Sequence, residues 1–152
     1  MSGTQPDLPR VRVALMEGRK LRCSVGQHVI VTDRKSADGG TGSGCTSGEL
    51  LLVAAGSCAT GAVRRYLDGR EYPSRDMAVE VALKPAALPG SRDIIAIDIF
   101  VSADVREDDL PQIKTAALSG GVVGRLALGS EIEILVHRAD AGSEKRDNPH
   151  VE

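Results

Sequence analysis

The sequence predicts an α+β domain in which short antiparallel strands and two helices share one core. Three observations predict this class. Apolar and polar residues alternate in several short segments, two other segments are apolar at helical spacing, and glycine-containing turns separate them. The predicted order is βββ-α-ββ-α-β, with the helices gathered against one sheet. A chain of 152 residues suits a single domain with a hydrophobic core.

The strands are predicted mainly from alternation of apolar and polar residues. Five segments show it, namely 11–15, 21–25, 79–83, 95–101 and 132–136, and the short apolar run 28–31 is predicted as a further strand. Alternation buries one face of a strand and exposes the other to water, which favours an antiparallel sheet. The first three segments are joined by glycine-containing turns, so we expect a meander there.

The first helix is predicted from Ser47 to Leu67. Thr46 and Glu49 have the spacing of a capping box directly before the apolar run, and Gly69 follows the last turn. Residues 50–55 include no polar side chain, and small residues follow them. We therefore expect this helix to be buried nearly all round, with a second copy of the chain closing over it.

A second helix is predicted over residues 108–118, resuming at Val122. Residues 1–9 are polar and aperiodic, which predicts a flexible N-terminal arm. Residues 139–152 are small or charged and predict a disordered C-terminal tail. The folded domain is therefore expected over residues 10–138.

Composition excludes several classes of protein. The net charge of −2 and the aromatic content of 2% argue against nucleic-acid binding, which needs basic patches or stacking platforms. The longest fully apolar stretch is far below the roughly 20 residues of a membrane helix, and the N-terminus has no secretory h-region. Three cysteines are too few for a disulfide scaffold, so we expect a cytoplasmic protein.

Cofactor and metal motifs are weak. The residues able to bind a transition metal show no paired spacing: Cys23, Cys45, Cys58, His28, His137 and His150. The glycine run 39–44 precedes a helix, as phosphate loops do, but it lacks the ending of a P-loop. A flexible linker is the alternative there, and we expect no cofactor and no metal.

Cys58 is the main candidate for chemistry. On the residues alone, a cysteine on an apolar helix face is expected to be a small buried hydrophobe. The alternative is a nucleophilic thiol, which needs a cation such as Arg65 or an arginine of the N-terminal strands. Glu49 precedes Cys58 by nine residues, which places the two side chains on opposite sides of the helix. The expected role of Glu49 is therefore to cap the helix, and any catalytic role would be relayed through an arginine.

The segment from Ser47 to Cys58 resembles the P-x-E-L-L-L-A-A-L-G-S-C signature of the OsmC/Ohr family of thiol peroxidases. The resemblance extends over about residues 11–137. It implies an intertwined homodimer with central buried helices, and a peroxidatic Cys58 that attacks organic hydroperoxides. It also implies a supporting arginine oriented by Glu49, for which Arg19 and Arg22 are candidates by region.

The sequence departs from the family pattern in two ways. No cysteine follows Cys58, although the family carries its second cysteine on the second helix, and the signature proline is absent near Ser47. Cys45 lies thirteen residues before Cys58, too far along a helix for a disulfide. Reduction would then depend on Cys23 or on an external thiol.

The function expected from the resemblance is thiol-dependent reduction of organic hydroperoxides by a homodimer, with Cys58 as nucleophile and an external or non-standard reductant. The alternative is loss of the peroxidase activity, with the dimer cleft binding a hydrophobic small molecule. A third, weaker possibility is a phosphate-ligand module on the glycine run. No nucleic-acid or membrane partner is expected.

Overall fold

The computed structural model describes residues 10–75, 77–86, 88, 92–119 and 121–129. Its elements are β1 (Val11–Leu15), β2 (Leu21–Val25), β3 (His28–Thr32), α1 (Ser47–Gly69), β4 (Ala78–Lys84), β5 (Ile94–Phe100), α2 (Leu110–Leu118) and α3 (Gly121–Leu128). Short 3-10 turns lie at Ser36–Asp38 and Glu107–Asp109. The predicted α+β class is confirmed.

The N-terminal sheet is an antiparallel meander, β1-β2-β3. A two-residue turn joins β2 to β3, and Gly26 has φ +56° at the position where a type II′ turn requires a positive φ. The register aligns Val13, Cys23 and Ile30 across the three strands, on one face. That face is apolar, yet 56% of Val13 and 43% of Ile30 stay exposed, because no helix of the chain packs on this sheet within the described residues.

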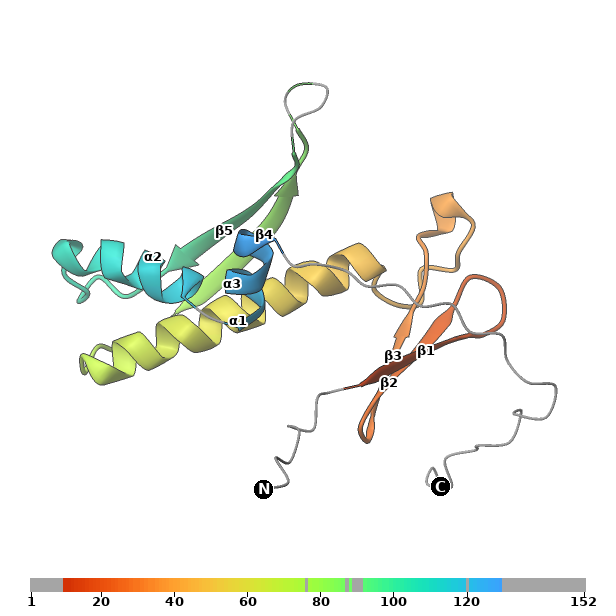
Figure 1. Ribbon diagram of the computed structural model, residues 1–152, viewed down its shortest axis with the longest axis horizontal. Coiled ribbons are helices and arrows are strands. Elements are labelled where there is room, and N and C mark those ends of the chain that lie inside the picture. The colour runs from red at the N-terminus through yellow and green to blue at the C-terminus, as the bar shows by residue number, and fades with distance from the viewer. Residues whose placement is uncertain (1–9, 76, 87, 89–91, 120, 130–152) are drawn as a thin grey trace, which may run out of the picture.

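The second part of the molecule is a layer of helices on the β4-β5 hairpin (Figure 1). The long helix α1 contacts β4, α2 and α3. Buried apolar side chains of the three helices and of the segment after β5 form one core cluster: Ala55, Ala59, Val63, Leu67, Val105, Ile113, Ala117 and Val123. The hairpin adds partly buried side chains that pack against this cluster, namely Val79, Val81, Ile97 and Ile99. Leu67 and Val63 are the largest fully buried side chains of this cluster.

The prediction of a single sheet is wrong for the described residues, which form a three-stranded and a two-stranded sheet. The reason is the length of α1, which links β3 to β4. Its 23 residues rise about 35 Å and carry the chain away from the first sheet (Figure 1). The alternation of each strand is local and was predicted correctly, whereas the pairing of distant strands is not encoded in it.

Both ends of α1 are defined by hydrogen bonds. At its start, Thr46 and Glu49 form the predicted capping box. At its end, the Tyr72 N–H donates to the Leu67 carbonyl and the Glu71 N–H to that of Asp68, the pattern of a Schellman motif. The helix therefore ends at Gly69, two residues later than predicted.

The N-terminal half of α1 is not buried within one chain, contrary to the prediction of a helix buried all round. Val53 is 57% exposed and Leu51 is 44% exposed. Burial begins at Ala55, because β4, α2 and α3 pack only on the later turns of α1. The exposed turns are those over which a second copy of the chain is predicted to close.

The remaining boundaries agree closely. The second helix begins at Leu110 after a 3-10 turn, and the resumption predicted at Val122 begins one residue earlier, at Gly121. The predicted strand 132–136, the arm 1–9 and the tail 139–152 lie outside the described residues. In the described part of the chain, no helix combines the length and the apolar character that crossing a bilayer requires.

Candidate functional site

Cys58 lies near the middle of α1 and faces the core. Its side chain is partly buried and packs against the apolar cluster. The sequence places it one turn after Ala55, which is 1% exposed. Cys58 is therefore at the border between the buried and the open half of the helix, where a thiol is both shielded by apolar groups and within reach of a ligand.

Gly121, the first residue of α3, lies against the Cys58 thiol. A Cβ built on Gly121 would be 2.6 Å from the Cys58 Sγ, closer than real Cβ contacts allow. The glycine also has φ +57°, a conformation that residues with a Cβ rarely adopt. Two independent constraints therefore select glycine here, in the region where the family resemblance would place a second cysteine.

An apolar cleft of about 280 Å³ lies between α1, β5 and the helices α2 and α3. We call it the α3 cleft, and define it by the residues that line it: Ala55, Asp93, Ile95, Ile97, Leu118, Val123 and Leu126. Ala55, Ile97 and Val123 belong to the same apolar assembly that Cys58 packs against. The cleft therefore shares wall residues with the apolar surroundings of the thiol, while neither Cys58 nor Gly121 lines it.

Glu49 has the predicted capping role. Its Oε2 accepts a hydrogen bond of 2.8 Å from the Thr46 N–H, and the Glu49 N–H donates to Thr46 Oγ1 over 3.2 Å. Lys35 Nζ lies 3.6 Å from Glu49 Oε1. The hydrogen bond from the Thr46 N–H lowers the pKa of the Glu49 carboxyl, and the nearby charge of Lys35 lowers it further. This keeps the carboxylate charged at the helix N-terminus, a favourable place for a negative charge.

The arginines proposed from the resemblance do not meet Cys58 within one chain. Arg19 lies in the turn before β2, and Arg22 lies on β2, opposite Ala14 and Val31. Their sheet stands beyond the N-terminal end of α1, away from the middle of that helix (Figure 1).

Arg65, on α1 itself, follows Cys58 by two turns on the same face. Its Nη1 would be 3.9 Å from a Cβ on Gly61, so its guanidinium extends back along the helix by about one turn. In the described part of a single chain, Arg65 is therefore better placed than Arg19 or Arg22 to face Cys58.

The glycine run 39–44 is an ordered loop built round the carboxylate of Asp33. That carboxylate is 3% exposed and accepts from the Thr41 hydroxyl over 2.6 Å and from the N–H groups of Arg34, Thr41 and Ser43. The hydrogen bond from the Thr41 hydroxyl, with the backbone N–H bonds, lowers the pKa of Asp33. A phosphate would have to compete for these donors with a buried negative charge, so the geometry disfavours the phosphate-loop hypothesis.

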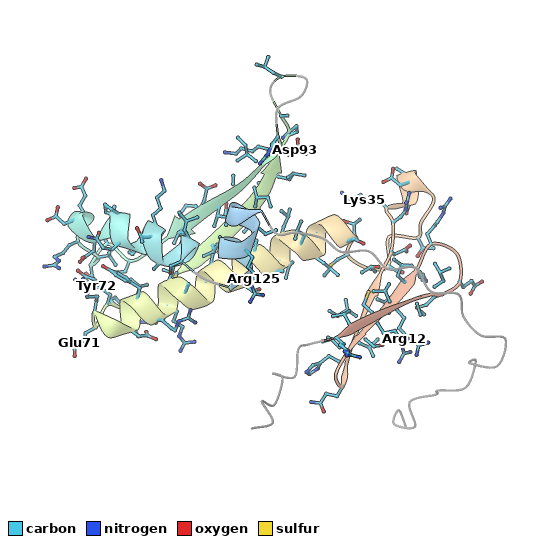
Figure 2. All side chains as sticks on the ribbon, in the orientation of Figure 1. Arg12, Lys35, Glu71, Tyr72, Asp93 and Arg125 are labelled. Carbon is cyan, nitrogen blue, oxygen red and sulfur yellow. The ribbon has the colours of Figure 1, made fainter. Side chains whose placement is uncertain are left out.

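A second buried carboxylate, Asp109, ties α2 to the far end of α1. Tyr72 Oη donates to it over 2.5 Å, Tyr66 Oη over 3.2 Å, and Arg106 Nη2 over 3.0 Å. Arg70 Nη1 lies 3.3 Å away and completes the set (Figure 2 shows Tyr72 at this end). No local pattern in the sequence predicts this network, because its members lie about forty positions apart in the chain.

The three cysteines are separate within one chain, and no disulfide joins them. Cys45 is exposed before the start of α1, and Cys23 lies on the apolar face of the first sheet. Neither is on an element that packs near Cys58.

No protein-family model matches the sequence, and no curated protein sequence matches it significantly. Solved structures do match. A protein of Psychrobacter arcticus 273-4, described as osmotic stress induced and of the detoxification response, gives a TM-score of 0.63 at 17% identity, over 80% of this chain and 90% of that one.

An organic hydroperoxide resistance protein OsmC from Legionella pneumophila gives a TM-score of 0.53 at 16% identity, over 75% of this chain and 84% of that one. An organic hydroperoxide resistance protein from Vibrio cholerae O1, with captopril bound in one of its active sites, gives a TM-score of 0.52 at 15% identity. That match covers 76% of this chain and 81% of the other one. These likenesses confirm the fold that the resemblance implied: the chain has the fold of the OsmC-type proteins.

Proposed function

We propose that this protein reduces organic hydroperoxides, with Cys58 as the nucleophile. The observation that carries the proposal is the position of the thiol, which is half-buried on α1 among apolar side chains and lies against Gly121. An apolar surrounding favours the alkyl part of an organic hydroperoxide over hydrogen peroxide. Two structures of the same fold belong to organic hydroperoxide resistance proteins, which supports this chemistry.

The reaction balances with one nucleophile and two equivalents of external thiol. The Cys58 thiolate attacks the terminal oxygen of the hydroperoxide, so that an S–O bond forms, the O–O bond breaks and the alkoxide takes up a proton to leave as the alcohol. Cys58 is now a sulfenic acid. A first external thiol condenses with it and releases water, and a second reduces the mixed disulfide, which returns Cys58 and leaves the external disulfide.

The external reductant follows from the absence of a second thiol beside Cys58. Gly121 occupies the place against Sγ, and the sequence contains no cysteine after Cys58. Cys45 is held before the helix by its hydrogen bond with the Asp33 N–H. A thiol from solution is therefore the simplest source of the two electrons.

We infer that the working form is a homodimer. The apolar face of the first sheet includes Val11 at 59%, Val13 at 56% and Leu15 at 86% exposure, and Val53 of α1 is equally open. A groove of about 620 Å³ runs along α1 and β4, next to these open turns. Packing the apolar face of a second copy's sheet over α1 would bury both apolar surfaces. Arg22 lies on the opposite face of that sheet, so Arg19, in the turn before β2, is the candidate arginine that this arrangement leaves for Cys58.

The test is consumption of cumene hydroperoxide by the wild type and by Cys58→Ser, with dithiothreitol and then dihydrolipoamide as reductant. We expect turnover with the wild type, none with Cys58→Ser, and unchanged turnover with the matched control Cys45→Ser. If wild-type Cys58 stays reduced under excess peroxide, the peroxidase proposal fails. The alternative, binding of a hydrophobic small molecule in the dimer cleft by a cytoplasmic protein, would then take its place.

A further inference from the structure

We propose that the outer face of the N-terminal sheet attaches the protein to membrane surfaces that carry anionic phospholipids. This inference goes beyond the proposed function and does not depend on Cys58. Its basis is two arginines and two valines that lie together on one exposed face of β1, β2 and β3. We call this face the basic face and define it by its residues: Arg12, Ala14, Arg22, Ser24, Val29 and Val31.

The positive charge of the chain is concentrated around this sheet. Residues 10–35 contain seven lysines and arginines and two acidic residues, a net charge of +5 in a chain whose net charge is −2. The remainder of the chain therefore carries −7. The low net charge of the whole chain hides this asymmetry, which is typical of a protein that binds a polyanion with one part of its surface.

The two arginines lie diagonally across β1 and β2. The register pairs Arg12 with Ser24, and Arg22 is two residues along β2 from that partner. Diagonal neighbours of an antiparallel pair are about 7–8 Å apart, so the two guanidinium groups can bind one phosphate or two adjacent ones. Both side chains are exposed, and neither forms an ion pair with a described residue. Figure 2 shows Arg12 on this sheet.

Exposed valines lie beside these charges. Val31 is directly opposite Arg22, and Val29 is directly opposite Ser24; they are 38% and 46% exposed. A surface that combines guanidinium groups with aliphatic side chains suits the boundary between phospholipid headgroups and acyl chains. Binding of a single-stranded nucleic acid would use aromatic stacking, and residues 10–35 contain no Phe, Trp or Tyr.

The size of the basic face favours a membrane over a folded protein partner. Three strands of five residues give a face of about 17 Å by about 14 Å, or about 240 Å². A stable protein interface needs about 800 Å² on each partner. A membrane has no such minimum, because each basic residue near anionic lipids contributes separately to the attachment.

The basic face stays accessible in the proposed dimer, because the opposite, apolar face of the sheet is the one that covers α1. The expectation of no membrane partner depends on the length of the apolar stretches in the sequence. That length concerns spanning a bilayer and not lying on its surface. A basic face needs no apolar helix to attach a protein to anionic lipids.

The test is co-sedimentation of the full-length protein with vesicles of phosphatidylcholine alone, and of an equal mixture of phosphatidylcholine and phosphatidylglycerol. We expect attachment to the mixed vesicles only, and its loss in high salt. Arg12→Gln combined with Arg22→Gln should lower the partition coefficient about 25-fold, because each arginine near an anionic surface contributes about fivefold. Urea unfolding of each variant checks that it is folded.

The matched control is Arg75→Gln combined with Lys114→Gln, which changes the net charge equally at exposed positions after α1 and on α2. It should leave the partition coefficient within about twofold of the wild type. The inference is overturned if the wild type does not attach to the mixed vesicles, or if both double variants lose attachment equally.

A contact between copies would give a different result. If the wild type does not attach to vesicles, and Arg12→Gln with Arg22→Gln raises the dissociation constant of the dimer, the basic face is an interface between chains and the inference is wrong. Attachment is measured without turnover, so the outcome is separate from whether Cys58 consumes hydroperoxide.

Discussion

Replacing Gly121 by alanine tests the contact that defines the site. The change adds a Cβ at 2.6 Å from the Cys58 Sγ, and it places a residue with a side chain at φ +57°. Both effects destabilise the folded state, but they have different origins. The first depends on the sulfur atom, and the second on the backbone alone.

The two costs can be estimated separately. Overpacking a filled site costs about 1–3 kcal/mol. A left-handed conformation costs a residue with a Cβ about 1–2 kcal/mol. Gly121→Ala should therefore lower the free energy of unfolding by about 2–5 kcal/mol. With Cys58→Ala in the background, the sulfur is gone and the remaining cost should be about 1–2 kcal/mol.

The assay is a double-mutant cycle in urea, with the free energy of unfolding measured for the wild type, both single variants and the double variant. The expected coupling energy between the two positions is about 1–3 kcal/mol. If Gly121→Ala is equally destabilising with and without the sulfur atom, the thiol does not lie against Gly121. The reasoning about the missing second cysteine would then be refuted.

Three other predictions follow from the fold. Glu71 has φ +57° at the end of α1, so Glu71→Gly should raise the free energy of unfolding by about 1 kcal/mol in urea, and a loss of stability would contradict the Schellman assignment. Leu15 is 86% exposed in one chain, and burying its side chain at the interface contributes about 1.5–3 kcal/mol of free energy per copy. Leu15→Asp should therefore raise the dissociation constant of the dimer more than about 100-fold in sedimentation experiments. An unchanged dissociation constant would count against this interface. The hydrogen bond from the Tyr72 hydroxyl, and to a smaller extent those from Arg106, lower the pKa of Asp109 below its unfolded value of about 3.9. The stabilisation by Asp109 is complete above its unfolded pKa and is lost as the pH falls through its folded pKa. The difference in free energy of unfolding between the wild type and Asp109→Asn should therefore narrow below about pH 4. A difference that stays constant with pH would refute this prediction.

The elements of the fold were predictable because their signals are local. Alternation and one short apolar run located five strands to within one or two residues, and Thr46 with Glu49 marked the start of α1. The end of α1 was placed two residues early, because the signal there is Glu71 in a left-handed conformation rather than a glycine. A motif that depends on the backbone φ of a non-glycine residue leaves no trace in the sequence.

The arrangement of these elements was not predictable from the same signals. Whether the two groups of strands join in one sheet depends on what α1 packs against, which is decided by contacts between distant residues. The glycine run illustrates a second limit. Its composition suggested a phosphate loop, while its conformation is determined by Asp33, an acceptor six residues before the run.

The candidate site was predicted in part. Cys58 was identified from the helix and from the resemblance, and the capping role of Glu49 is confirmed. Gly121 was missed, because it acquires its role from packing against α1, an element far away in the sequence. The roles of Arg19 and Arg22 stay predictions, since one chain does not bring them to the thiol.

The most direct test of the central claim is a single turnover with one equivalent of cumene hydroperoxide and no reductant. The protein is then treated with dimedone, which reacts with sulfenic acids, and its intact mass and the cumyl alcohol are measured. We predict one dimedone adduct on Cys58 per alcohol formed, and neither product with Cys58→Ser. Alcohol formed without an adduct on Cys58, or unreacted hydroperoxide beside a reduced Cys58, would contradict the account.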